Sequence, residues 1–312
     1  MDIAIVICTY NGAEDIPDVL ECLHAQEGTS SVQWEVLVVD NNSTDATETI
    51  VRNYQESWQR EVPLRYAFEG RQGKSYAMET AVTKAAGEWV AFLDDDNLPA
   101  PDWTAAAYRF AQSHPTAGAF GGQVHGRFES EPPKSFGVVK PLFALNERSQ
   151  EICYSAGRGM TFAAPGAGLV VRKRAWEESI PEGGLSQAGT VAEERGEVGE
   201  DMELQWYLYQ NGWEIWHNPE MHLDHKIPAE RLEEESLREF CEAIGHGRYH
   251  TRMIRLKPWQ RPFATVGYWG ADLWKLGRLC WRHRTDVFAD RFVRGRARMI
   301  LSTLAAPFVS NG

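Results

Sequence analysis

The first half of the chain alternates two patterns of hydrophobic positions. Short apolar runs, typical of strands buried on both faces, occur at Ile3–Cys8, Trp34–Val39, Leu64–Phe68 and Trp89–Leu93. Between them apolar residues recur at helical spacing, as in Ile16, Val19, Leu20 and Leu23, and again over Lys74–Ala86. This alternation predicts an α/β fold with a mainly parallel sheet covered by helices on both faces.

The second half of the chain is less regular. The stretches "GAFGGQVHGRFE" from Gly118, "GAGLVVRKRAW" from Gly166 and Trp213–Trp216 read as further strands, whereas Pro181–Gly199 is a long Gly- and Glu-rich loop, a lid or a disordered segment. After about Lys226 the pattern becomes helical and basic. We therefore predict one domain over residues 1–225 and a helical basic region over residues 226–312.

The charge is distributed unevenly along the chain. The net charge is −12, but the segment from Arg248 to the end holds 13 Lys and Arg against 3 Asp and Glu, interleaved with tryptophans. We see no nucleic-acid-binding motif, and the acidic remainder would repel a polyanion, so we predict no nucleic-acid partner. Two interpretations stay open for the basic region: an amphipathic surface on anionic lipid, or a helical bundle paired with the acidic body or a second subunit.

The sequence also indicates where the protein resides. No apolar run approaches the roughly 20 residues that span a bilayer, and the N-terminus has no basic segment of the secretory type. The five cysteines are scattered and form no Cys-x-x-Cys pair. We expect a cytoplasmic protein, peripheral at the inner face of the cell membrane if the basic region binds lipid.

Polar residues follow the strands at the edge where a parallel sheet binds ligands. They are Thr9, Tyr10, Asn11, Asp40 and the triplet Asp94, Asp95 and Asp96 in "WVAFLDDDNLP". Three adjacent carboxylates repel one another, and clustered carboxylates suit a divalent cation, Mn²⁺ or Mg²⁺, that bridges them to phosphate. A solvated acidic turn that caps the next helix is the alternative.

Four ordered motifs carry a resemblance to a known family. "IVICTYNGAEDIPDVLECL", "WEVLVVDNNSTDAT", "GKSYAMETAVTKAAGEWVAFLDDDNLPAPDW" and "GEDMEL" together resemble a family 2 glycosyltransferase of the GT-A fold. "GAGLVVRKRAW", "GWEIWHNPEMHLDH" and "RMIRLKPWQRP" are similar to cyanobacterial glycosyltransferases of hormogonium polysaccharide biosynthesis. The resemblance implies a Rossmann-like GT-A domain that uses a UDP- or GDP-linked sugar.

The resemblance implies a donor site on the N-terminal half. Thr9, Tyr10 and Asn11 would line the nucleotide pocket, and Asp40 would accept hydrogen bonds from the base or ribose; a simple turn-forming role is the alternative for Asp40. Gly73 and Lys74 would lie near the diphosphate. The family often shows Ala-Arg-Asn a few residues later, where this chain has Ala77-Met78-Glu79, so Arg71 is a substitute candidate.

The resemblance also implies metal ligands and a catalytic base. Asp96 would bind the cation, Asp94 would be its partner in the Asp-x-Asp motif, and Asp94 or Asp95 would contact the ribose. His225 is the candidate histidine ligand. Glu200 and Asp201 match the family's Glu-Asp pair, in which the aspartate is the base; a helix-start role favoured by the helix dipole is the alternative.

An acceptor site and a reaction follow from the same resemblance. Gly166, Ala167 and Gly168 would form the acceptor pocket floor, or else serve ordinary strand packing. The processive motif Gln-x-x-Arg-Trp is missing after Asp201, which favours the addition of one sugar. The resemblance further implies metal-dependent transfer with inversion to a glycan or lipid-linked acceptor in polysaccharide biosynthesis. The alternatives are a sugar-1-phosphate nucleotidyltransferase and a non-catalytic carbohydrate- or lipid-binding module.

Overall fold

The computed structural model describes residues 1–58, 61–156, 163–185 and 199–309. The chain divides into two compact units. The first, which we call the sheet unit, comprises Met1–Arg127, Ala144–Ser186 and Leu204–Lys226. The second, the helical unit, comprises Phe128–Phe143, Gln187–Glu203 and Ile227–Gly312. Most of the predicted loop Pro181–Gly199 lies outside the described residues.

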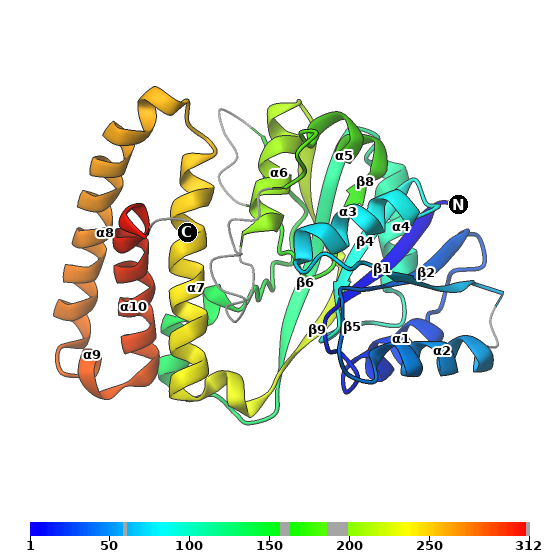
Figure 1. The fold of residues 1–312 in the computed structure, drawn as a ribbon, viewed down its shortest axis with the longest axis horizontal. Coiled ribbons are helices and arrows are strands. Elements are labelled where there is room, and N and C mark those ends of the chain that lie inside the picture. The colour runs from blue at the N-terminus through cyan, green and yellow to red at the C-terminus, as the bar shows by residue number, and fades with distance from the viewer. Residues whose placement is uncertain (59–60, 157–162, 186–198, 310–312) are drawn as a thin grey trace. The chain divides into compact units, whose positions relative to one another are not determined.

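The sheet unit is built on one mixed sheet (Figure 1). Its strands are β1 (Ile3–Thr9), β2 (Trp34–Asp40), β3 (Leu64–Phe68), β4 (Trp89–Asp94), β5 (Asn97–Pro99), β6 (Ala117–Phe128), β7 (Ile152–Cys153), β8 (Leu169–Arg172) and β9 (Glu214–Ile227). Their order is β3-β2-β1-β4-β8-β6-β9-β5, with β7 beside β9. The first four strands are parallel, whereas β8 is antiparallel to β4 and β6. The α/β fold and the mainly parallel start of the sheet are confirmed.

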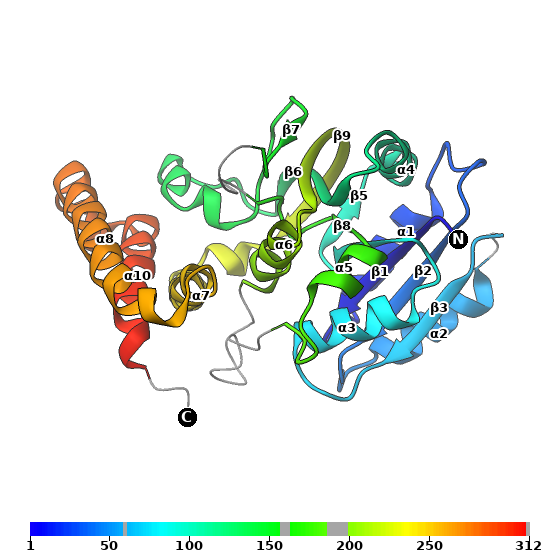
Figure 2. The same cartoon turned by 90° about the horizontal axis from the view of Figure 1, so that it is seen from above.

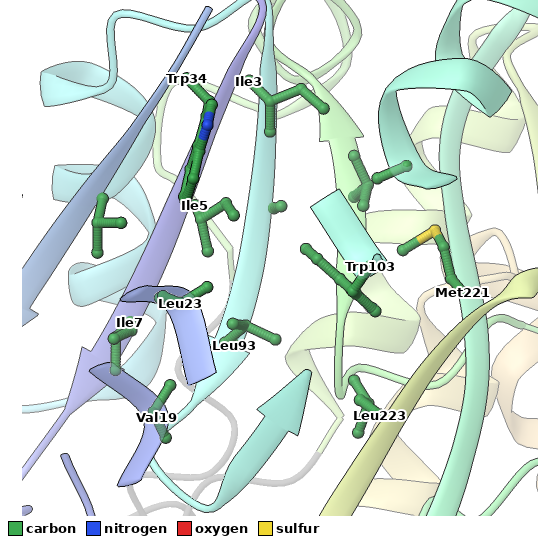
Figure 3. Packing of buried hydrophobic residues seen from close by; sticks show 14 of the residues in the cluster. Ile3, Ile5, Ile7, Val19, Leu23, Trp34, Leu93, Trp103, Met221 and Leu223 are labelled. Atoms are coloured by element: carbon green, nitrogen blue, oxygen red, sulfur yellow. The ribbon is translucent and has the colours of Figure 1, made fainter. Parts of the chain in front are cut away.

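Helices cover both faces of the sheet because successive side chains of a strand point to opposite faces. Ile3, Ile5 and Ile7 of β1 pack with α1 (Ile16–His24), α2 (Thr47–Ser57) and α4 (Trp103–Ser113). Figure 3 shows these side chains with Leu23 and Trp103. The alternate residues Ala4 and Val6 pack with α3 (Lys74–Lys84), α5 (Lys173–Ser179) and α6 (Glu200–Gln210). Two cores thus fix the strands and the loops that follow them.

The helical unit contains α7 (Glu234–Met253), α8 (Arg261–His283), α9 (Asp286–Ala289) and α10 (Arg291–Ala305), and α7, α8 and α10 lie side by side (Figures 1 and 2). Short 3₁₀ turns occur at Lys134–Val138, Lys140–Leu142, Ala229–Leu232, Pro258–Gln260 and Ala306–Phe308. Glycine allows α7 and α10 to approach closely, since a Cβ on Gly245 would lie 2.4 Å from the Met299 carbonyl oxygen. The predicted helical C-terminal region is confirmed.

A buried carboxylate ties α8 to α7. Asp272 has no exposed surface, and its Oδ1 accepts a hydrogen bond of 3.1 Å from Nη2 of Arg248. Arg252 also donates to Asp272 through both of its terminal nitrogens. Burial alone raises the pKa of Asp272, but the Arg252 hydrogen bond and the Arg248 charge outweigh it and lower the pKa below its usual value. Among the described helices none has the length and apolar character needed to cross a membrane.

Candidate active site

The carboxyl ends of three parallel strands meet at one edge of the sheet. In the strand register Thr9 of β1 is opposite Asp40 of β2, and Cys8 of β1 is opposite Asp94 of β4. The chain leaves all three strands at this edge, where Asn11, Ser43 and the aspartate triplet follow. The structure therefore brings together the polar groups that the sequence placed after separate strands.

Asp95, the middle carboxyl of the triplet, binds the end of the neighbouring strand. The Thr9 hydroxyl donates to its Oδ2 at 2.6 Å. Burial, and then the charges of Asp96 and Asp94, raise the pKa of Asp95 to about 7 against the opposing effect of the Thr9 hydrogen bond. The raised pKa favours the protonated form of Asp95, and protonation reduces the repulsion within the triplet.

Gly12 leaves the space for this contact. A Cβ atom at position 12 would lie 2.1 Å from Oγ1 of Thr9 and 2.6 Å from Oδ2 of Asp95. No side chain fits there while the two oxygens stay hydrogen-bonded. The sequence indicates only a turn at "TYNG". The structure shows that position 12 also needs glycine, because the side chains of Thr9 and Asp95 lie close to it.

Asp94 lies beside a cation from the start of α3. Lys74 Nζ is 2.7 Å from Asp94 Oδ1. The residue before it, Gly73, has φ of 136° and donates its backbone N–H to the side-chain oxygen of Asn41 at 2.7 Å. Asn41 also donates to the Arg71 carbonyl oxygen at 2.7 Å. A buried asparagine from the loop after β2 therefore positions the lysine that neutralises Asp94.

Asp96 pairs with the predicted histidine, His225. His225 Nε2 lies 3.2 Å from Asp96 Oδ2, and the amide of Asn97 donates to Asp96 Oδ1 at 2.8 Å. The pairing depends on β5 and β9, which are antiparallel with Asn97 opposite His225. Two residues that are 129 positions apart in sequence thus meet.

The Asp96–His225 pair fits a divalent cation. A carboxylate and an imidazole together suit Mn²⁺, and carboxylate oxygen also suits Mg²⁺. Within the described residues no three His, Cys, Asp or Glu side chains gather closely enough to hold an ion. A cation held here would therefore complete its coordination with water and substrate oxygens, as Mg²⁺ commonly does.

Asp40 is buried and has a partner on each carboxylate oxygen. The Ser43 backbone N–H donates to Oδ1 at 2.9 Å, and the Tyr66 hydroxyl donates to Oδ2 at 2.8 Å. Burial and the bond to Asp40 raise the pKa of Tyr66, so this phenol keeps its proton. The turn-forming role of Asp40 is present, and its donor-binding role stays a prediction.

The other predicted donor residues have varied surroundings. Asn11 has φ of 54°, and its side-chain oxygen accepts a hydrogen bond of 2.8 Å from the backbone N–H of Thr44, which ties the loops after β1 and β2 together. Tyr10 is 52% exposed. Arg71 makes a two-nitrogen contact with Glu69, at 3.0 and 2.8 Å. This pairing gives Arg71 a structural partner, and its contact with diphosphate stays a prediction.

The glycine segment before β8 has a packing explanation. Gly168 has φ of +72°, and a Cβ there would lie 2.5 Å from Leu223. Ala167 is buried in the core that contains Trp103. The contacts in the structure therefore correspond to strand packing for Ala167 and Gly168, and an acceptor role for Gly166, Ala167 and Gly168 stays a prediction.

The predicted base lies at the start of a helix. α6 begins at Glu200, so Glu200 and Asp201 occupy its first turn together with Glu203. Glu200 is buried, whereas Asp201 is half-buried. Acidic side chains in a first turn interact favourably with the helix dipole, so the alternative role has structural support and the catalytic role of Asp201 stays a prediction.

Three residues at the sheet edge were missed by sequence reasoning: Asn41, Tyr66 and Asn97. "DNNST" and "DDDN" did show asparagines next to strand-terminal acids, which was a usable signal for Asn41 and Asn97. Tyr66 offers no such signal, because its partner Asp40 is on a different strand. Lys226 was also missed, and it pairs with Asp15 and Asp18 of the first helix region at 2.6 and 2.9 Å.

Comparison with known proteins finds a family model that matches the N-terminal part of the chain. Residues 4–151 match the family model described as Glycosyl transferase family 2. This segment contains β1, β2 and β4 and the aspartate triplet that follows them. This match agrees with the family 2 resemblance that the sequence motifs carry.

Two curated relatives each match about a third of this chain. Glycosyltransferase AglE of Haloferax volcanii is 35% identical over 102 residues, which is 32% of each chain. The uncharacterized glycosyltransferase alr2836 of the cyanobacterium Nostoc is 31% identical over 101 residues, 32% of this chain and 30% of the relative. The chain thus spans about a third of these relatives, and the cyanobacterial similarity has only this loose support.

A solved structure extends the similarity to almost the whole fold. The mannosyltransferase PcManGT from Pyrobaculum calidifontis, in complex with GDP-Man and Mn²⁺, has a TM-score of 0.61 at 20% identity, over 98% of this chain and 87% of that one. At this identity the comparison establishes fold alone. The predicted GT-A fold is confirmed.

The packing of Gly12 gives a first prediction. Gly12→Ala forces Thr9 and Asp95 apart, so we expect a loss of about 1–3 kcal/mol in the free energy of unfolding. The measurement is urea denaturation followed by tryptophan fluorescence. Gly183→Ala is the control, because nothing lies within 4 Å of a Cβ there. Equal stability of both variants would contradict the packing argument.

Proposed function

We propose that the chain transfers one sugar from a UDP- or GDP-linked donor to a hydroxyl of a glycan or lipid-linked acceptor, with inversion, in polysaccharide biosynthesis. The observation that carries the proposal is the gathering of Thr9, Asp40 and the triplet Asp94–Asp96 at one sheet edge within the family 2 segment. His225 adds an imidazole to that edge.

The donor nucleotide would bind along the ends of β2, β1 and β4. Asp40 keeps its carboxylate oriented through Tyr66 and Ser43 and would accept hydrogen bonds from the base or ribose. Lys74 would contact the diphosphate, because it begins a helix whose N-terminus also favours negative charge. These roles account for why Asp40 and Lys74 are held by neighbouring residues at this edge.

Asp96 and His225 would hold the cation, with Asp94 as the partner acid of the motif. Mn²⁺ or Mg²⁺ bound there would offset the charge that develops on the departing nucleoside diphosphate. Asn97 supports this role, since its amide fixes the Asp96 carboxylate from the side opposite to His225's contact. The PcManGT complex contains Mn²⁺, which agrees with a divalent ion in this fold.

Asp201 would act as the general base. In a single displacement the acceptor oxygen forms a bond to the anomeric carbon while the bond from that carbon to the diphosphate oxygen breaks. The proton of the acceptor hydroxyl passes to the Asp201 carboxylate. Asp201 lies half-buried in the first turn of α6.

Removing the proposed metal ligand tests the metal site. Asp96→Ala is expected to lower turnover of a UDP- or GDP-sugar by on the order of 100-fold, which corresponds to about 2.7 kcal/mol of lost charge stabilisation. The assay is nucleotide release from a panel of nucleotide sugars with Mn²⁺, with Mg²⁺ and with EDTA. Asp102→Ala, an exposed acid six residues later, is the control. Turnover that persists in EDTA would contradict metal dependence.

Separating binding from turnover tests the base. Asp201→Asn is expected to lower kcat about 10²- to 10⁴-fold and to change the Kd of the donor, measured by calorimetry, less than twofold. Asp286→Asn serves as control, since Asp286 is also an acid in a first helical turn. Equal losses of binding and turnover in Asp201→Asn would show a structural role.

We propose further that the helical unit contacts an anionic membrane surface. Bulky apolar side chains are exposed there, with Trp259, Phe263, Trp274, Trp281 and Phe288 at 62–81% exposure. They alternate with the 13 cations that follow position 247. Exposed aromatics next to Lys and Arg are the composition of surfaces that lie in the lipid headgroup region.

Vesicle binding tests the membrane contact. Trp281→Ser combined with Phe288→Ser is expected to reduce co-sedimentation with phosphatidylglycerol vesicles at least fivefold, because both side chains are about 80% exposed and each supplies buried apolar area on lipid. Phe68→Ser is the control, an exposed aromatic of the sheet unit. Unchanged co-sedimentation of the double variant would contradict the contact.

A further inference from the structure

The helical unit contains a cavity of about 740 Å³ whose wall is strongly basic. It is formed by the turn Lys134–Val138 and by α7, α8 and α10. Its cationic lining residues are Lys134, Arg248, Lys275, Arg278, Arg282 and Arg296. Among the described residues that line it none is an aspartate or glutamate. The cavity therefore concentrates positive charge in a protein whose net charge is −12.

This charge is only partly neutralised within the unit. The buried carboxylate of Asp272 pairs with two wall cations, Arg248 and Lys275, and also with Arg252, which lies outside the lining. Within the described residues Lys134, Arg278, Arg282 and Arg296 make no ion pair. Burial and then the Arg252 charge lower the pKa of Arg248, and burial and then the Arg248 charge lower the pKa of Lys275. Burial is the larger cause for both pKa values, and the neighbouring cations add to it.

One wall donor has no acceptor. Nη1 of Arg248 is buried and makes no hydrogen bond to any described residue, although Nη2 of the same guanidinium bonds Asp272. A buried donor left unsatisfied destabilises the fold. A ligand that brings an acceptor oxygen to Arg248 recovers that free energy.

The chemistry of the wall selects the ligand. The wall contains several guanidinium groups together with lysines. A guanidinium binds two phosphate oxygens at once, and one phosphate has enough oxygens to bind several such groups, whereas a single carboxylate does not. The rest of the wall includes apolar side chains, Val138, Trp274, Leu279, Met299 and Ile300. A phosphate with an apolar attachment matches both parts.

We propose that this cavity is a binding site for a phosphate group, carried by a lipid headgroup or present as free phosphate. The site lies within the helical unit and is distinct from the strand-end residues assigned above to donor and cation. The inference holds whether or not the chain transfers sugar, because it depends only on the cavity wall. The two proposals share Trp274 and several wall cations, but the membrane contact is tested at Trp281 and Phe288, which do not line the cavity.

The test uses the full chain and two probes, inorganic phosphate and dihexanoyl phosphatidic acid below its micelle concentration. Binding is measured by calorimetry at about 150 mM salt, where distant surface charges are largely screened. Arg278→Gln with Arg282→Gln removes two exposed wall cations that have no ion-pair partner among the described residues, so the variant is expected to fold. Arg291→Gln with Arg298→Gln removes the same charge from exposed positions of α10 outside the lining.

The expected result is binding of at least one probe, weakened at least tenfold in the wall variant and less than twofold in the control variant. Phosphatidic acid that binds at least tenfold more tightly than phosphate would identify a lipid headgroup, and equal affinities would identify free phosphate. Absence of binding to both probes, or an equal loss in the two variants, would overturn the proposal. Circular dichroism of both variants confirms that any loss arises in a folded chain.

Discussion

The structure depends on how three adjacent carboxylates are held at the end of one strand. Asp94, Asp95 and Asp96 each have a different kind of partner: the ammonium of Lys74, the hydroxyl of Thr9, and the imidazole of His225. The raised pKa of Asp95 favours its protonated form, which reduces the repulsion further. The three acids therefore each contact a different neighbour at the sheet edge, and their role in binding a cation stays a prediction.

These three partners come from elements that are far apart in the sequence. Thr9 ends β1, Lys74 begins α3, and His225 lies near the end of β9. Asn41 and Asn97 hold the loops that present them, through Gly73 and Asp96. Because each contact is short and the supporting residues are mostly buried, the edge is preorganised, which is what a site for a charged donor requires. The family 2 match over residues 4–151 is consistent with that arrangement.

The helical unit handles charge in another way. At the sheet edge the excess is negative and every acid of the triplet has a nearby donor. Around Asp272 the excess is positive, with one buried carboxylate among several cations and an Arg248 donor left without an acceptor. The two places thus differ in the sign of their local excess charge.

The sequence alone determined the class of fold and the edge of the sheet that carries the polar groups. Continuous apolar runs such as Ile3–Cys8 predict strands that are buried on both faces, and the order of the motifs predicted the family. It also anticipated that His225 belongs with Asp96. What only the tertiary structure decided is which partner each carboxyl takes. Thr9, Lys74 and Tyr66 meet Asp95, Asp94 and Asp40 through strand register and helix packing, which arise from long-range contacts that a local pattern does not encode. The same limit applies to the basic cavity, because tail arginines on separate helices form one wall only after α7, α8 and α10 have packed.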